Sequence, residues 1–285
     1  MKILTNEKLD KYTTVRIGGI AEKFYIPENV HELIDVIGST PPDELRIIGG
    51  GSNLLINDQK TFARVIHLKE VDNTIEHRGN GTFYVGASVT LQKLIKHINE
   101  SGYGGIEYLY SVPALVGGAI AMNAGRGRKD NLAISDYLEE IHVLDVNNHE
   151  VKCLSKEECE FSFRNSVFKK TKNIVIGAVF AFEKTSSEKG TARREERMDF
   201  VKRTQDSSGF NFGCVFNGCN RYIMHFVRLT HPGYRNGMKF SKKTSNWLIH
   251  KGEGTFEQAI QLMNRIVKYH QLIGIKIKTE VVIWE

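Results

Sequence analysis

Two glycine-rich segments contain the residues whose spacing most clearly suggests chemistry. The first, Ile47 to Leu54, reads Ile-Ile-Gly-Gly-Gly-Ser-Asn-Leu and directly follows a short run of strand-forming residues. Glycines at a strand exit can adopt positive φ and turn successive backbone N–H groups inward, which makes a concave nest for phosphate oxygens. The same residues could instead form a simple tight turn, so this segment alone is compatible with either interpretation.

The second segment, Ser111 to Gly125, is apolar as well as rich in glycine. Two such loops in one chain favour an extended dinucleotide over a single phosphate group. Neither loop matches the G-x-G-x-x-G fingerprint of a Rossmann domain or the G-x-x-x-x-G-K-S/T loop of nucleoside triphosphatases. We therefore expect the dinucleotide to be held by another fold.

The bulk composition is that of an ordinary globular protein. The chain has 285 residues, of which 41% are hydrophobic and 25% charged, so we expect two or three packed units. The net charge of +6 suits anionic small molecules as well as nucleic acid. Residues 1–14 lack the apolar run of a signal peptide, and the most apolar stretch, 108–122, is too short to span a bilayer. A cytoplasmic protein without a membrane span is predicted.

Alternating strand and helix patterns surround the two loops. Residues 21–67 resemble a small βαβ unit, with an extended stretch at 23–26, a helix at 30–37 and a strand at 45–48. A second unit has a helix at 90–100, opened by a Thr cap, and three strands at 82–87, 141–145 and 174–182. A polar stretch near residue 185 suggests a domain boundary, and the chain ends with an amphipathic helix at 255–272 and a strand at 275–283.

Several other signals are better explained without a functional role. The run Lys189 to Arg203 interleaves basic and acidic residues as a solvated helix face does, so nucleic-acid binding is not expected. Neither the spacing of the cysteines nor that of the histidines matches a metal motif, so no metal site is predicted. The residues considered for a metal site are Cys153, Cys159, Cys214, Cys219, His225, His231 and His250. Of the four cysteines, all except Cys214 are interpreted as free thiols without a functional role.

Four segments occur in the order found in one enzyme family: Thr14 to Gly19, Gly49 to Leu54, Ser111 to Gly125 and Phe163 to Phe168. In these motifs the chain resembles the UDP-N-acetylenolpyruvoylglucosamine reductase family, clearly over residues 8–183 and in patches beyond. The resemblance implies an α+β chain with a two-lobed FAD-binding fold of the vanillyl-alcohol oxidase/PCMH type and a C-terminal α+β substrate domain. The implied divisions are residues 1–70 for FAD-binding lobe 1, 71–184 for lobe 2 and 185–285 for the substrate domain.

The same resemblance implies a flavoenzyme of peptidoglycan precursor synthesis. Non-covalent FAD would accept hydride from NADPH, and UDP-N-acetylglucosamine enolpyruvate would then be reduced to UDP-N-acetylmuramate. Because the family uses one cleft alternately for NADPH and the UDP-sugar, ping-pong kinetics are expected. The residues carried over as cofactor-binding are Arg16, Gly49, Gly50, Gly51, Ser52, Asn53, Leu54, Ser111, Pro113, Gly117, Gly118, Ala119, Asn123 and Gly125.

Carried over in the same way, Arg164, Cys214 and Glu280 are the catalytic candidates, with Cys214 where most of the family has serine. Hydride addition to one carbon of the enolpyruvyl double bond leaves an enolate beside an existing carboxylate. An arginine can neutralise that charge, a glutamate can support it through a hydrogen bond, and a thiol can deliver a proton to the other carbon. Taken singly, the three residues would more often be an ion-paired arginine, a packed thiol and an edge-strand carboxylate.

The chain also departs from the family pattern. Ala114, Leu115 and Phe163 replace the glycine, small hydroxyl residue and tyrosine that are usual there, and residues 217–245 hardly match the family's substrate loop. Two alternatives therefore stay open: an FAD reductase acting on a different nucleotide-sugar or enoate, and a catalytically silent flavin or nucleotide-sugar binding protein. The presence of Arg164, Cys214 and Glu280 argues against a silent protein.

Overall fold

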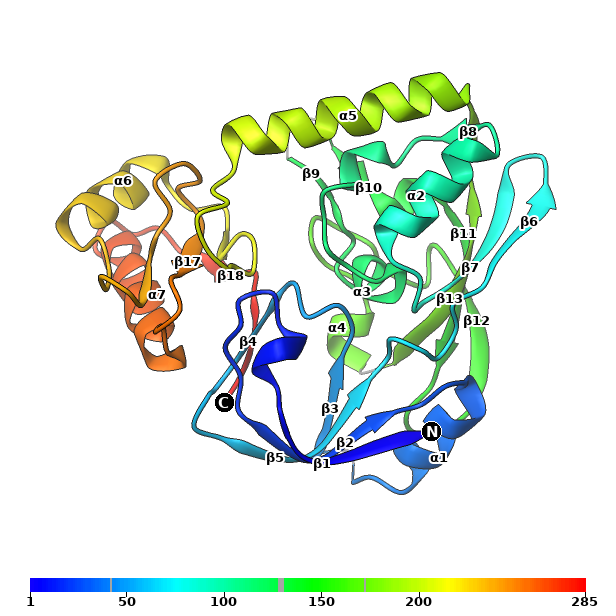
Figure 1. Ribbon diagram of the computed structural model, residues 1–285, viewed down its shortest axis with the longest axis horizontal. Helices are drawn as coiled ribbons and strands as arrows, with labels where there is room; N and C mark the ends of the chain where they lie inside the picture. Colours follow the sequence, from blue (N-terminus) through cyan, green and yellow to red (C-terminus); the bar gives the residue numbers. More distant parts are fainter. Residues whose placement is uncertain (42, 128–130, 172) are drawn as a thin grey trace. The chain divides into compact units, whose positions relative to one another are not determined.

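The computed structural model describes residues 1–41, 43–127, 131–171 and 173–285 (Figure 1). The chain mixes helices and strands and divides into two compact units. The first unit comprises residues 1–5, 23–50 and 63–200, and the second comprises residues 6–22, 51–62 and 201–285. Among the described residues, none of the helices is long and apolar enough to cross a membrane. The three-domain division expected from the sequence stays a prediction.

A five-stranded antiparallel sheet organises the first unit. Its strands follow the order β12-β11-β13-β7-β6, with bounds Val151–Ser155, Leu138–Leu144, Ile174–Ala181, Thr82–Gly86 and Ile75–Gly79. Helices α2 (Leu91–Glu100) and α3 (Val116–Ala121) share one buried core with β7, β11 and β13, to which Phe83, Ile98 and Phe180 contribute fully buried side chains (Figure 1). This core fixes the segment that carries the second glycine loop.

A four-stranded sheet carries the first glycine loop. It has the order β1-β2-β5-β3, with bounds Lys2–Lys8, Ile20–Ile26, Thr61–His67 and Leu45–Ile48, and α1 (Val30–Gly38) follows β2. Strands β3 and β5 pair in parallel, with Ile48 opposite His67. The apolar residues of α1, including Leu33 and Val36, are buried, as its helical spacing predicts. The loop therefore leaves the carboxyl end of a paired strand.

The second unit packs two helices with three small strand pairs. Its elements are β4 (Leu54–Ile56) with β19 (Val282–Trp284), β15 (Phe216–Asn217) with β18 (Lys278–Thr279), β16 (Met238–Phe240) with β17 (Leu248–His250), α6 (Arg221–Thr230) and α7 (Phe256–Gln271). Phe212, Phe216, Met224 and Ile266 belong to its buried core. Shorter elements complete the chain: η1 (Asp10–Tyr12), β8 (Tyr103–Gly104), η2 (Glu107–Leu109), β9 (Gly125–Arg126), β10 (Leu132–Ala133), η3 (Ile134–Tyr137), α4 (Phe168–Thr171) and β14 (Glu183–Lys184).

The predicted helices at 30–37, 90–100 and 255–272 are confirmed, and the caps explain their starts. Thr90 and Thr255 each accept a hydrogen bond from the backbone N–H three residues later, at 3.2 Å in both cases. The amphipathic character of α7 is confirmed, because Phe256, Leu262, Met263 and Ile266 are buried, while Ile260 and Val267 are partly buried against the same core.

The helix expected for the charged run Lys189 to Arg203 is confirmed as α5, Ser187–Thr204, and Ser186 Oγ accepts the N–H of Lys189 at 3.2 Å. One sequence expectation was wrong in extent. The strand expected at 275–283 is interrupted around Glu280, where the backbone changes its hydrogen-bonding partner. Glu280 N donates to Val215 O at 2.8 Å, whereas Val282 N donates to Asn53 O at 3.0 Å.

Candidate functional site

The two glycine loops meet inside the first unit. A Cβ placed on Gly50 would lie 3.1 Å from the carbonyl oxygen of Pro113 and 3.2 Å from Cα of Ala114, so the two backbones run against each other. By contrast, a Cβ on Gly49 or Gly118 would meet nothing within 4 Å. One glycine therefore allows the loops to pack together, and the other two leave backbone uncovered beside that contact. This surface fits the phosphates of a dinucleotide, which need close access to backbone N–H groups.

His67 supports the first loop, although it was not singled out from the sequence. Its side chain hydrogen-bonds the backbone of Gly49, and only 9% of the residue is exposed. Burial, together with the charge of Lys69, lowers the pKa of His67 to about 4, so the ring is neutral at neutral pH. No local sequence signal marks His67, because only the pairing of β3 with β5 places it opposite Ile48 at the start of the loop.

Glycines of the second loop have a packing role. A Cβ on Gly117 would lie 2.8 Å from Cβ of Ala87, and one on Gly125 would lie 2.1 Å from the carbonyl oxygen of Leu132. Gln92 holds the start of the loop in place, because its Nε2 donates a hydrogen bond to Val112 O at 2.7 Å. Ser111 is also engaged, since its Oγ accepts a hydrogen bond from Arg197 Nε at 2.9 Å. The loop is thus a rigid, closely packed surface.

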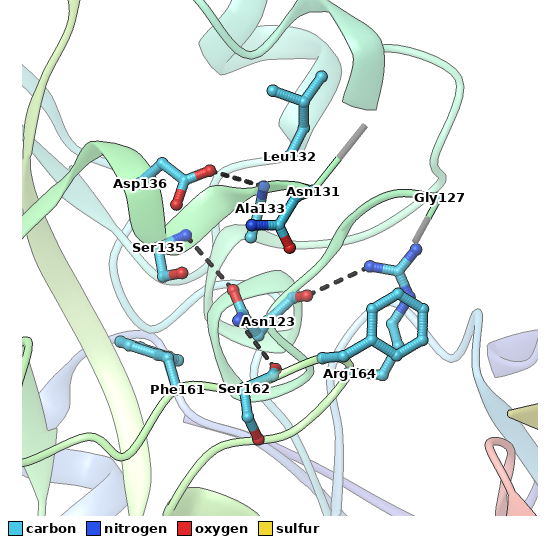
Figure 2. Close-up of a pocket in the computed structure, with 11 residues that line it drawn as sticks. Asn123, Gly127, Asn131, Leu132, Ala133, Ser135, Asp136, Phe161, Ser162 and Arg164 are labelled. Atoms are coloured by element: carbon cyan, nitrogen blue, oxygen red, sulfur yellow. Dashed lines mark hydrogen bonds between the residues drawn. The ribbon is translucent and has the colours of Figure 1, made fainter. Parts of the chain in front are cut away.

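Arg164 borders a cavity of about 180 Å³ in the same unit (Figure 2). Its guanidinium donates to Asn123 O at 3.3 Å and to Gly125 O at 2.5 Å, which joins Arg164 to the end of the second loop. Asn123 in turn donates through Nδ2 to Ser162 O at 3.0 Å and accepts the N–H of Ser135 at 3.4 Å. Three predicted site residues, Asn123, Gly125 and Arg164, therefore lie together.

Backbone conformation marks some of the same residues. Arg164, Asn123 and Arg16 have φ values of 55°, 43° and 58°, in the left-handed region that glycine and asparagine adopt most readily. For arginine this conformation costs roughly 1–2 kcal/mol. Arg164 occupies the third position of a turn closed by the backbone hydrogen bonds between Ser162 and Asn165, both 3.0 Å. Strained residues of this kind are enriched at functional sites, but His149 and Glu160 share this conformation without a proposed role, so the roles of Arg164 and Arg16 stay predictions.

The second unit brings Cys214 and Glu280 into adjacent backbone segments. Strand β15 pairs with β18, with Phe216 opposite Thr279, and Glu280 N continues the pairing by donating to Val215 O at 2.8 Å. Cys214 is exposed and Glu280 is half-buried. Asn53, a predicted cofactor-binding residue, donates through Nδ2 to Glu280 O at 3.1 Å. Two of the three catalytic candidates thus share one backbone junction with the end of the first loop.

Asn246 is a further residue of this junction that the sequence did not reveal. Its Nδ2 donates to Phe216 O at 2.7 Å, while its Oδ1 accepts the N–H of Phe216 at 3.1 Å. The backbone carbonyl of Asn246 accepts the N–H of Val215 at 2.9 Å. One asparagine therefore holds both residues that follow Cys214. Only the three-dimensional pairing shows this role, because Asn246 lies far from Cys214 along the chain.

Arg16 lies in the second unit, on an exposed loop. Its guanidinium donates to Lys11 O at 3.0 Å and lies 5.8 Å from the centroid of the Phe210 ring. The preceding residue, Val15, is buried, and its carbonyl oxygen lies 2.7 Å from Nδ1 of His250. The remaining carried-over residues divide between the units: Ala119 belongs to the first, and Gly51, Ser52 and Leu54 belong to the second.

A basic pocket of about 460 Å³ opens elsewhere in the second unit. It is lined by residues from the end of α6 through β16, within the stretch where the family resemblance is weakest. Four of the lining side chains are cationic, and aromatic and apolar residues complete the wall: Arg228, Leu229, Pro232, Gly233, Tyr234, Arg235, Lys239, Phe240 and Lys242. Such a pocket suits an anionic ligand that also has an apolar or planar part.

Known proteins similar to this chain point to one family. The family described as an FAD binding domain matches residues 21–154. The UDP-N-acetylenolpyruvoylglucosamine reductase of Thermotoga petrophila is 30% identical, over 98% of this chain and 97% of that protein. The enzyme of the same name from Bacillus subtilis is 29% identical, over 94% of this chain and 88% of its own length.

A solved structure agrees with these relatives. The UDP-N-acetylenolpyruvylglucosamine reductase from Thermus caldophilus has a TM-score of 0.81 to this chain at 26% identity, and the match covers 100% of this chain and 98% of that one. The expected α+β, FAD-binding fold is confirmed, and the similarity extends through the C-terminal region where the motifs were patchy. The chain belongs to the UDP-N-acetylenolpyruvoylglucosamine reductase family.

Proposed function

We propose that this protein is an FAD-dependent, NADPH-consuming reductase that converts UDP-N-acetylglucosamine enolpyruvate into UDP-N-acetylmuramate, a precursor of peptidoglycan. The observation that carries the proposal is the backbone junction of Cys214 with Glu280, in a chain whose similarity to reductases of that name covers nearly its full length. A silent binding protein has no need to keep a proton donor and a carboxylate on adjacent backbone segments. We also propose a cytoplasmic location, in keeping with cysteines that are all in the thiol form.

The two glycine loops would hold the FAD pyrophosphate. Gly49 and Gly118 leave their backbones uncovered, and the contact of Gly50 with Pro113 and Ala114 sets the loops at a fixed separation. When bound, FAD supplies the hydride chemistry, accepting hydride from NADPH and delivering it to the substrate. The other carried-over loop residues would line the rest of the cofactor, with Asn123 and Gly125 held in place by Arg164.

Each catalytic candidate has a separate task in the reduction of the double bond. As hydride reaches one carbon of the enolpyruvyl group, the π electrons move toward the carboxylate, and the thiol of Cys214 donates its proton to the other carbon. Arg164 would stabilise the negative charge of the enolate, and Glu280 would hydrogen-bond the same group. The substrate thus gains one hydride and one proton, and the Cys214 thiolate is reprotonated from water.

The UDP part of the substrate would use the basic pocket of the second unit. A diphosphate carries two adjacent negative charges, which suit the cationic side chains of Arg235 and Lys239. Both residues lie in a turn that is closed by an antiparallel β-bridge between Gly233 and Lys239. Tyr234 and Phe240 add aromatic surface suited to a base or sugar face. Because this segment differs from the family pattern, a related nucleotide-sugar stays the alternative acceptor.

Visible spectroscopy of the purified protein tests the proposal. The protein should be yellow, release its flavin on denaturation, lose the flavin absorbance with anaerobic NADPH and regain it when UDP-N-acetylglucosamine enolpyruvate is added. Initial rates with both substrates varied should give the parallel lines of a ping-pong mechanism. Reoxidation by another enoate or nucleotide-sugar, but not by this substrate, would select the alternative acceptor. A colourless protein that also refuses added FAD would overturn the proposal.

A further inference from the structure

Three potential metal ligands gather on the large sheet of the first unit, apart from the residues proposed for catalysis. Glu140 and His142 are two residues apart on β11, and Cys153 on the edge strand β12 is the direct register partner of His142. Side chains at positions i and i+2 of a strand share one face of the sheet, and a directly opposed cross-strand residue shares it too. Strands β11 and β12 are neighbours in the sheet (Figure 1), and their register brings a carboxylate, an imidazole and a thiol to one place.

The ligand atoms are already close to one another. His142 Nε2 lies 2.9 Å from Glu140 Oε1, and His142 Nδ1 lies 3.9 Å from Cys153 Sγ. One ligand atom from each residue can be chosen so that all three lie within 4.8 Å of one another. A tetrahedral zinc ion has its ligands about 2.0–2.3 Å away, and therefore roughly 3.3–3.8 Å from one another. Because the contacts to Glu140 and Cys153 use different ring nitrogens of His142, the side chains must rotate so that one nitrogen, the thiolate and the carboxylate face the same ion.

His142 is held in place from the neighbouring strands. The ring of Tyr84 meets the imidazole edge-on, with centroids 5.3 Å apart, and the Tyr84 hydroxyl donates to Asp72 Oδ2 at 2.7 Å. Gly177, the register partner of His142 on β13, leaves room for this contact, since a Cβ there would lie 2.4 Å from the Tyr84 oxygen. The imidazole side chain is 24% exposed, although its Nε2 atom is itself buried, so the ring is partly preorganised.

We propose that Glu140, His142 and Cys153 form a zinc-binding site, with water as the fourth ligand. The thiolate and imidazole select a borderline-soft ion such as Zn²⁺ over Mg²⁺ or Ca²⁺, which prefer oxygen ligands alone. The thiolate and the carboxylate together carry two negative charges, which match the charge of the ion. In the metal-free protein the hydrogen bond to Glu140 raises the pKa of the Cys153 thiol, so zinc takes the place of that proton and releases it.

Zinc titration of the purified, FAD-containing protein tests the site. Calorimetry should find one Zn²⁺ bound per chain at neutral pH, with weaker binding as the pH falls, because protons compete for the ligands. Alkylation with iodoacetamide, followed by mass spectrometry of the peptides, should show that Zn²⁺ protects Cys153. Cys214 is exposed as well and acts as the internal control, whose alkylation rate should not change. Equal alkylation of Cys153 with and without Zn²⁺ would overturn the proposal.

Variants separate this site from adventitious zinc binding. Cys153→Ser and His142→Ala should each weaken Zn²⁺ binding at least about 100-fold, since even residues that only support a ligand cost about 10- to 100-fold. Glu139 precedes Glu140 and is outside the cluster, so Glu139→Gln should leave the affinity unchanged while Glu140→Gln lowers it. The unfolding temperature of Cys153→Ser without zinc should match the wild type, because Cys153 is exposed. Unchanged zinc affinity in both Cys153→Ser and His142→Ala would refute the site.

Discussion

The glycine loops of the first unit and the Cys214 junction of the second unit are built in different ways. In the loops, the important property is the absence of side chains: Gly50 and Gly117 allow close packing, while Gly49 and Gly118 leave backbone uncovered. At the junction, the important property is backbone pairing between distant segments, with Glu280, Val215, Asn53 and Asn246 joined by hydrogen bonds. Local composition therefore marks the first site, whereas the hydrogen bonds that build the second appear only in the tertiary structure.

The largest effect should come from the uncovered face of the loops. Gly118→Leu should abolish FAD binding, because a Cβ at this position has nothing within 4 Å and the longer side chain would fill the space where we place the cofactor. Gly117→Leu is the matched variant: it collides with Ala87, which lies 2.8 Å from a Cβ, and should cost about 1–3 kcal/mol of stability. Flavin absorbance and chemical denaturation measure the two effects. A yellow, stable Gly118→Leu protein would contradict the assignment of the nest.

Arg164→Ala should slow flavin reoxidation by substrate by about 100-fold or more, because the enolate would lose its charge stabiliser. Flavin reduction by NADPH should change far less, since no enolate forms in that half-reaction. Stopped-flow absorbance follows both steps separately. Equal damage to the two half-reactions would assign Arg164 to folding or shared binding, as its hydrogen bonds to Asn123 and Gly125 would then suggest.

Asn246→Ala tests whether backbone pairing positions Cys214. Loss of its two side-chain hydrogen bonds to Phe216 should cost about 1–3 kcal/mol of stability and slow reoxidation, while NADPH still reduces the flavin normally. Asn220→Ala is the control, because Asn220 only caps α6 and its loss should cost about 1 kcal/mol. If both variants slow reoxidation equally, the effect comes from general destabilisation of the unit and the positioning role fails.

A smaller effect should appear in the pH dependence of stability. Because the pKa of His67 is lowered to about 4 in the folded protein, the unfolded chain takes up the proton first as the pH falls. The contribution of neutral His67 to the free energy of unfolding is therefore fully present above the unfolded pKa of about 6.5 and is lost as the pH falls from there to 4. The loss at pH 4.5 should be about 2 kcal/mol. Denaturant unfolding of wild type and His67→Gln at pH 7.5 and 4.5 measures it. The same pH dependence in both proteins would exclude His67 as the cause.

The sequence predicted most of the local structure, whereas the roles of the candidate site residues stay predictions. Helices such as α2 were found because Thr90 caps an apolar repeat, and the loops because three consecutive glycines are unusual after a strand. His67 and Asn246 were missed, since their partners Gly49 and Phe216 become neighbours only through strand pairing and loop closure. The extent of the C-terminal strand was wrong for a related reason: its partner changes from β15 to β4 around Glu280.

The central claim, that Cys214 donates the proton, is tested most directly by single-turnover reoxidation. Reduced Cys214→Ala and Cys214→Ser proteins are mixed anaerobically with UDP-N-acetylglucosamine enolpyruvate, and the return of flavin absorbance is recorded. Reoxidation should nearly stop in Cys214→Ala, because hydride addition without protonation reverses. It should be partly retained in Cys214→Ser, whose hydroxyl has similar donor geometry. Cys219→Ala should match the wild type. Reoxidation of Cys214→Ala at the wild-type rate would contradict the account.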